Sequence, residues 1–196
     1  MAEGRWVRIT PGFLLTMAVM FWLDEGVGLL GWGVLACVVH ELGHLLVGAA
    51  LGGRPRWLSL SAVGLELNME YPAGLSYGRE LAVALAGPAV NLLLLPLGRQ
   101  FPLFATLSLC LAVFNLLPVA PLDGGRALRA ALLMHLETTA VRRVMTAAAA
   151  VCGIGLAILS LWVSVGLGGG LWPVLVAALT LLRVGLSIAE EQRNQL

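Results

Sequence analysis

Long apolar segments alternate with short polar ones along most of the chain, and this pattern predicts membrane-spanning helices. Charged residues are absent from residues 81–98, 101–122 and 144–182, and one more apolar segment, residues 26–53, contains Glu41 as its single charged residue. About 20 apolar residues cross a bilayer, so we predict six spans. These are residues 9–23, 27–51, 79–98, 101–117, 141–165 and 171–188.

A different period occurs between the second and third spans. Apolar and polar residues alternate along residues 63–70, which is typical of a strand. We therefore predict a small β-hairpin over about residues 54–70. The fold class is then an all-α polytopic membrane protein with this one hairpin, and residues 1–196 are interpreted as a single domain with no PDZ and no CBS domain. The loop between these spans leaves no room for an inserted soluble domain.

Composition and charge agree with the membrane assignment and add an orientation. The chain is 59% apolar and 12% charged, with a mean hydropathy of +0.92. All twelve basic residues are arginines, and ten of them fall on the side of the predicted spans that holds the N-terminus, whereas Arg99 lies opposite. The positive-inside rule then predicts a multi-pass protein of the cell membrane with both termini cytoplasmic. A net charge of +1 argues against a nucleic-acid partner.

The second span contains the segment His-Glu-Leu-Gly-His, residues 40–44. Because polar side chains are costly in hydrocarbon, they indicate a functional site. On a helix His40 and His44 lie one turn apart on one face, which suits two ligands of one zinc ion, and Glu41 stands beside the open position as a general base. This predicts one Zn²⁺ per chain, with the site in the cytoplasmic half of the membrane.

A catalytic zinc needs a third protein ligand. The candidates in this sequence are His135, Asp123, Glu66 and Glu70. We favour Asp123, because two prolines and two glycines in residues 118–125 break the helix after the fourth span and present this carboxylate at a comparable depth. His135 instead belongs to a predicted amphipathic or surface helix near a charged loop.

Two further segments carry polar residues inside predicted spans. In the third span Gly87 and Asn91 share one face, and Pro88 bends the helix. The pattern is typical of a close helix crossing with an interhelical hydrogen bond from Asn91. Direct contact of Gly87, Pro88 and Asn91 with substrate is the alternative. The fourth span ends at Asn115, just before the proline-rich break.

These motifs together resemble the site-2 proteases, the intramembrane zinc metalloproteases of peptidase family M50. Within the family the chain looks closest to the stage IV sporulation protein FB type. The resemblance implies that His40, His44 and Asp123 hold zinc, that Glu41 activates the water bound to it, and that Asn115 helps to bind substrate or the oxyanion. It also implies membrane-associated protein substrates, such as a sporulation sigma-factor precursor, and inhibitory membrane partner proteins.

Three other interpretations compete with a metalloendopeptidase. A structural or transport metal site would need four protein ligands or a polar path through several spans. A catalytically inactive membrane scaffold, or metal-binding pseudoprotease, would bind and retain partners. A metal carrier would show metal flux.

Overall fold

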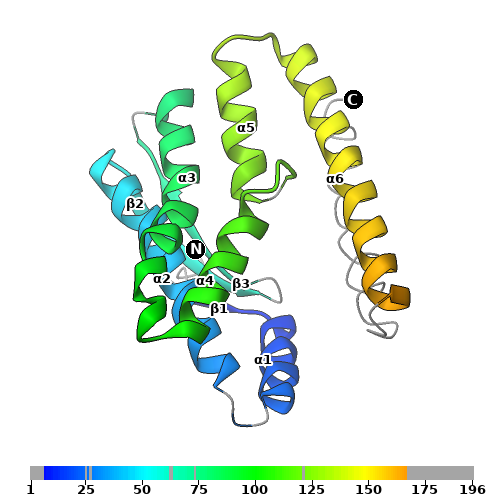
Figure 1. The fold of residues 1–196 in the computed structure, drawn as a ribbon. Helices are drawn as coiled ribbons and strands as arrows, with labels where there is room; N and C mark the ends of the chain where they lie inside the picture. Colours follow the sequence, from blue (N-terminus) through cyan, green and yellow to red (C-terminus); the bar gives the residue numbers. More distant parts are fainter. Residues whose placement is uncertain are drawn as a thin grey trace. The chain divides into compact units, whose positions relative to one another are not determined.

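The computed structural model describes residues 7–24, 26, 28–61, 64–72, 74–120 and 122–166, and the chain divides into two compact units, Met1–Asn115 and Leu116–Leu196 (Figure 1). The first unit contains β1 (Val7–Ile9), α1 (Pro11–Leu23), α2 (Leu29–Ala50), β2 (Arg54–Ser61), β3 (Gly64–Glu70), α3 (Tyr77–Leu93), the 3-10 helix η1 (Leu95–Arg99) and α4 (Pro102–Asn115). The second contains α5 (Asp123–Leu133) and α6 (Thr138–Gly166).

Within the described residues, three helical segments are long and apolar enough to cross a membrane: Leu29–Ala50, Tyr77–Arg99 and Thr138–Gly166. They correspond to the predicted second, third and fifth spans. The helices at the predicted first and fourth spans, α1 and α4, are 13 and 14 residues long, so in the described part of the chain they are shorter than a full crossing. The predicted sixth span, residues 171–188, lies outside the described residues.

The predicted hairpin is confirmed, and it belongs to a three-stranded sheet with the order β1-β2-β3. β2 and β3 pair antiparallel, with Leu58 opposite Leu67, and the turn residues 62–63 lie outside the described part. β1 pairs parallel with β2 and was not predicted. Three residues are too few for the period-two pattern by which strands are recognised, so their pairing partner creates this strand.

The end of α2 fixes where the sheet begins. Gly52 has a φ of 88° and donates its N–H to the carbonyl of Ala49, while Gly53 donates to the carbonyl of Gly48. These two bonds form a Schellman motif, which needs a residue that tolerates a left-handed backbone. The chain then enters β2 directly. β3 returns to the same helix end, since a Cβ on Gly48 would collide with the side chains of Met69 and Tyr71.

α2 and α3 cross at very short range. A Cβ built on Gly43 would lie 2.7 Å from the carbonyl oxygen of Ala86 and 3.0 Å from a methyl carbon of Val90. Small residues at a crossing allow helix backbones to approach in a membrane, where apolar burial alone provides little driving force. α4 packs against both helices, through buried residues that include Phe104, Ala105 and Ala112.

In the second unit a short connection reverses the chain between α5 and α6 (Figure 1). α6 is long, and most of its large apolar side chains are exposed, among them Val151, Ile158 and Trp162. An apolar helix with an exposed apolar surface is what contact with lipid requires. Its buried residues are small or β-branched: Val141, Ala149 and Gly153.

Gly43→Ala tests the crossing. The added methyl group would push α3 away from α2, and overpacking of this kind typically costs about 1 to 3 kcal/mol. We expect a lower midpoint in thermal unfolding of the detergent-solubilised chain. Gly33→Ala on the same helix is the matched control, because a Cβ there meets nothing within 4 Å. Equal midpoints for the two variants would contradict the close approach.

Candidate metal centre

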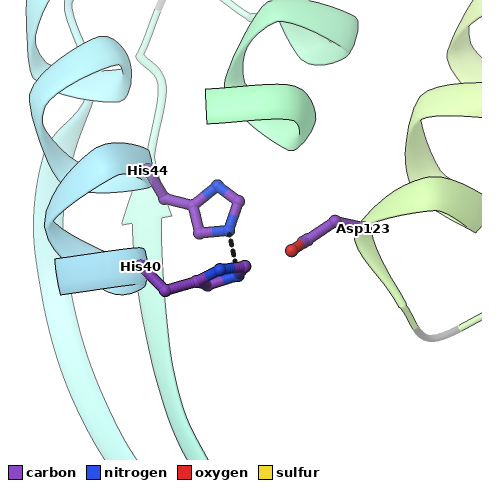
Figure 2. Close-up of side chains that lie close together, drawn as sticks. All are labelled: His40, His44 and Asp123. Atoms are coloured by element: carbon purple, nitrogen blue, oxygen red, sulfur yellow. Dashed lines mark hydrogen bonds between the residues drawn. The ribbon is translucent and has the colours of Figure 1, made fainter. Parts of the chain in front are cut away.

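The imidazoles of His40 and His44 face each other from successive turns of α2. Both residues are buried, at 4% and 8% exposure. Their Nε2 atoms lie 3.2 Å apart, and the rings meet nearly edge to face with centroids 4.9 Å apart (Figure 2). The predicted one-turn spacing therefore brings two ligand nitrogens to a single point beside α2.

A hydrogen bond sets the tautomer of one ring. Nδ1 of His44 lies 2.7 Å from the carbonyl oxygen of Val83 on α3. A carbonyl can only accept, so Nδ1 carries the proton and donates it. In the neutral ring Nε2 then offers a lone pair toward His40. Metal-binding histidines are commonly oriented in this way by a bond from the second ring nitrogen.

The spacing of the two nitrogens suits zinc. Two nitrogen ligands of a tetrahedral zinc, with bonds of about 2.0 to 2.1 Å, stand about 3.3 to 3.4 Å apart. The observed separation of 3.2 Å is close to this value. The structure thus holds His40 and His44 in an arrangement that fits a shared ion.

Gly87 closes the space beside the imidazoles. A Cβ at this position would lie 2.7 Å from Nε2 of His40 and would collide with Nε2 of His44. Only a residue without a side chain lets the backbone of α3 pass so close to both ligand atoms. Pro88 and Asn91 on the same helix are also buried. The predicted close crossing therefore lies at the histidine pair itself.

Asp123 belongs to the second unit, where it is the first residue of α5 and is 8% exposed. A carboxylate is favoured at a helix N-terminus. The predicted break before it is confirmed: α4 ends at Asn115, and the described residues 116–120 and 122 are irregular. Side chains at Gly124 and Gly125 would collide with the backbone of residues 116–120, so the two glycines let this segment fold against the start of α5.

Among the described residues, His40 and His44 of the first unit and Asp123 of the second are buried side chains that each offer one ligand atom to a metal ion (Figure 2). Asp123 also lies 3.8 Å from the guanidinium of Arg126, one turn later on α5. The other residues considered as a third ligand are not buried in this way where the structure describes them. Glu70 is exposed and lies 3.9 Å from Arg56, and His135 is exposed. The side chain of Glu66 is outside the described part.

Known proteins are similar to this chain in sequence and in fold. The model of peptidase family M50 matches residues 95–162. A putative zinc metalloprotease of Synechocystis is 29% identical over 79% of this chain, and the putative zinc metalloprotease Rip3 of Mycobacterium tuberculosis is 32% identical over the same share. The alignments cover 45% and 44% of those relatives, so the chain spans less than half of their length.

A solved structure agrees over nearly the whole chain. The site-2 protease from Methanocaldococcus jannaschii superposes with a TM-score of 0.63 and 26% identity, covering 96% of this chain and 94% of that one. The chain belongs to the site-2 protease family. The family resemblance inferred from residues 40–44, 87–91 and 115–125 is confirmed, whereas the sporulation subgroup stays a prediction.

Asn115 and Asn91 were predicted as tentative contacts of substrate. Asn115 is half-buried at the end of α4, and its Nδ2 donates to the carbonyl of Leu111. Asn91 is completely buried, and neither of its amide atoms bonds to any described residue. The interhelical hydrogen bond expected from Asn91 is therefore not formed within the described part of the chain.

Gly87→Ala tests the metal centre without measuring proteolysis. The added methyl group would occupy the space beside the two Nε2 atoms, and we expect the zinc affinity of the chain to fall about 10- to 100-fold, as for changes in the surroundings of metal ligands. Zinc content after dialysis against a competing chelator measures it. Gly31→Ala on α2 is the control, since nothing lies within 4 Å of its Cβ. Undiminished zinc in Gly87→Ala would refute the assignment.

Proposed function

We propose that this chain is an intramembrane zinc metalloprotease that hydrolyses peptide bonds of membrane-associated proteins. The observation that carries the proposal is the buried imidazole pair, with Nε2 atoms 3.2 Å apart in a helix apolar enough to cross a membrane. Membership of a family whose named relatives are zinc metalloproteases supports it.

Asp123 is the third ligand in this proposal. Its support is its burial, its position at the start of α5, and the chemistry of a carboxylate, which completes a set of two histidines and one acid known from catalytic zinc sites. Glu70 and His135 are exposed, which disfavours both as ligands of a buried ion. Three protein ligands would leave one position of a tetrahedral zinc for the reaction.

Glu41 moves the proton in this proposal. It is half-buried and directly follows His40, so its side chain points about 100° around α2 from that ligand. When bound, zinc supplies Lewis acidity that lowers the pKa of a water molecule toward about 7. Glu41 takes a proton from the attacking water and returns it to the leaving amine, a role that contributes about 10² to 10⁴ in rate.

The free edge of β3 is the proposed docking place for substrate. β2 pairs with one edge of β3, and no strand pairs with the other edge in the described part of the chain. Met69 packs against Gly48, one turn after His44, so β3 runs close to the helix that carries the histidines. An extended peptide could add to this edge, which would expose carbonyls that a helical substrate hides.

Three finer assignments belong to the same proposal and rest on the sequence. The arginine distribution favours cytoplasmic termini and a site in the cytoplasmic half of the membrane. The resemblance to the stage IV sporulation protein FB type suggests a sporulation sigma-factor precursor as substrate. It also suggests regulation by inhibitory membrane partners.

Glu41→Gln tests the proton-transfer role. The variant keeps the shape of the side chain but cannot accept a proton, so we expect zinc content to stay unchanged and cleavage to fall by about 10² or more. Co-expression with candidate membrane substrates, followed by immunoblotting, measures cleavage. A scaffold would cleave nothing in the parent chain either. A metal carrier would show metal flux that this substitution need not abolish.

Asp123→Asn tests the third ligand. The amide loses the negative charge that attracts the ion. Loss of a residue that only supports a metal ligand lowers affinity by at least about 10-fold, so loss of a ligand itself should lower zinc affinity by more than this. Competition with a chromogenic chelator measures it. Glu70→Gln is the control, and it should bind zinc like the parent. Parent-like zinc affinity in Asp123→Asn would exclude this carboxylate as a ligand.

A further inference from the structure

Among the described residues, the three largest completely buried side chains lie in α3 and α4: Asn91, Pro88 and Ser108. Two of them, Asn91 and Ser108, are polar. Neither the nitrogen nor the oxygen of the Asn91 carboxamide, nor Oγ of Ser108, has a hydrogen-bond partner among the described residues. A buried polar group without a partner costs about 1 to 3 kcal/mol. Three such atoms in a small apolar unit therefore need a ligand.

Two other polar side chains of α4 form hydrogen bonds within their own helix. Thr106 donates to the carbonyl of Pro102 at 2.9 Å, and Asn115 donates to the carbonyl of Leu111 at 3.0 Å. Both use the carbonyl four residues earlier, the usual solution for such residues in a helix. Ser108 does not use it. Pro88 adds an acceptor nearby on α3, because it has no N–H to give to the carbonyl of Ala84.

The size and the chemistry of these groups define the ligand. Asn91 and Ser108 are 0% exposed, so neither a peptide nor a second protein can reach them. The carboxamide requires both an acceptor and a donor, and the hydroxyl can serve as either. The ligand must be very small, uncharged, and able to donate and accept. Water meets all these conditions, and buried water typically makes about three hydrogen bonds.

We propose that the packed layer of α3 and α4 holds buried water, bound by the carboxamide of Asn91 and the hydroxyl of Ser108. This assigns Asn91 to a water-binding site in place of contact with substrate.

The site stands close to the metal centre. Asn91 follows Gly87 by four residues on α3, about 6 Å along the helix axis, and Gly87 is the residue that approaches both imidazoles. If the proposed proteolysis holds, each cleavage consumes one water: its oxygen bonds to the carbonyl carbon, the C–N bond breaks, and the amine gains a proton. The buried water is then a local supply within an apolar environment.

Water-edited solid-state NMR of the ¹⁵N-labelled full chain in bilayers tests the site. Magnetisation from water should reach the Asn91 side-chain amide quickly, as it does for the exposed Gln100 amide, and much faster than the backbone amide of buried Ala112. Loss of the signal in Asn91→Asp, which has nearly the same shape, assigns it. Transfer to Asn91 as slow as to Ala112 overturns the proposal.

A pair of variants on α4 sharpens the test. Ser108→Ala removes the hydroxyl, and we expect a several-fold weaker transfer to Asn91. Thr106→Ala removes a hydroxyl that is bonded within its own helix, and the transfer should stay as in the parent. An unchanged Asn91 signal in Ser108→Ala excludes a shared site. All spectra are recorded in the Glu41→Gln background, so this result does not depend on whether the chain cleaves a substrate.

A second measurement concerns the supply of water to the reaction. In the chain with Glu41 intact, Ser108→Ala should cleave several-fold more slowly with unchanged zinc content, whereas Thr106→Ala should match the parent. If the NMR signal behaves as expected but the cleavage rates are equal, the water is bound and the supply role is refuted. If no variant and no parent cleaves, the proposed function fails while the water site stands on the spectra.

Discussion

The close approach of α3 to α2 is the constraint on which the candidate site depends. Gly43 lets the backbone of Ala86 touch α2, and one residue later Gly87 passes beside both imidazoles. Because the helices are this close, the carbonyl of Val83 can accept from His44 and fix the ring. A metal centre in an apolar helix therefore needs a neighbouring helix whose backbone forms one wall and whose carbonyl orients a ligand.

The same constraint explains the distribution of polar groups in the first unit. A polar atom in an apolar interior must find a partner, and the described residues show two kinds of hydrogen bond. His44 bonds across to α3, whereas Thr106 and Asn115 bond back along their own helix. Asn91 has neither kind of bond within the described residues. Close packing thus satisfies most polar groups and isolates a few that require a small ligand.

Much of this arrangement could be predicted from local patterns. Residues 40–44 carry their spacing in the sequence, the alternation of residues 63–70 indicates a strand, and the prolines before Asp123 end a helix. Those features depend on neighbours in the chain, which a sequence displays directly. The predicted third span, residues 79–98, lies within one helical segment that is long and apolar enough to cross a membrane, and its last turns form a separate 3-10 helix that begins at Leu95.

What could not be predicted depends on contacts between distant residues. β1 forms because it pairs with the edge of β2. Gly87 matters because its backbone lies beside two imidazoles that come more than forty residues earlier in the sequence. The sequence does not show whether a glycine in a helix faces lipid or faces a pair of metal ligands. The unbonded state of Asn91 is likewise invisible, because its sequence pattern indicates an ordinary interhelical bond.

The start of α5 shows how a chain can offer a carboxylate in an apolar setting. Asp123 begins the helix, where exposed N–H groups favour negative charge, and Arg126 adds a cation one turn later. Gly124 and Gly125 permit the preceding segment to fold tightly against this turn. The charge is thus stabilised within the second unit before any metal is considered. A helix N-terminus and a neighbouring guanidinium therefore favour the negative charge of the carboxylate that the proposal uses as a zinc ligand.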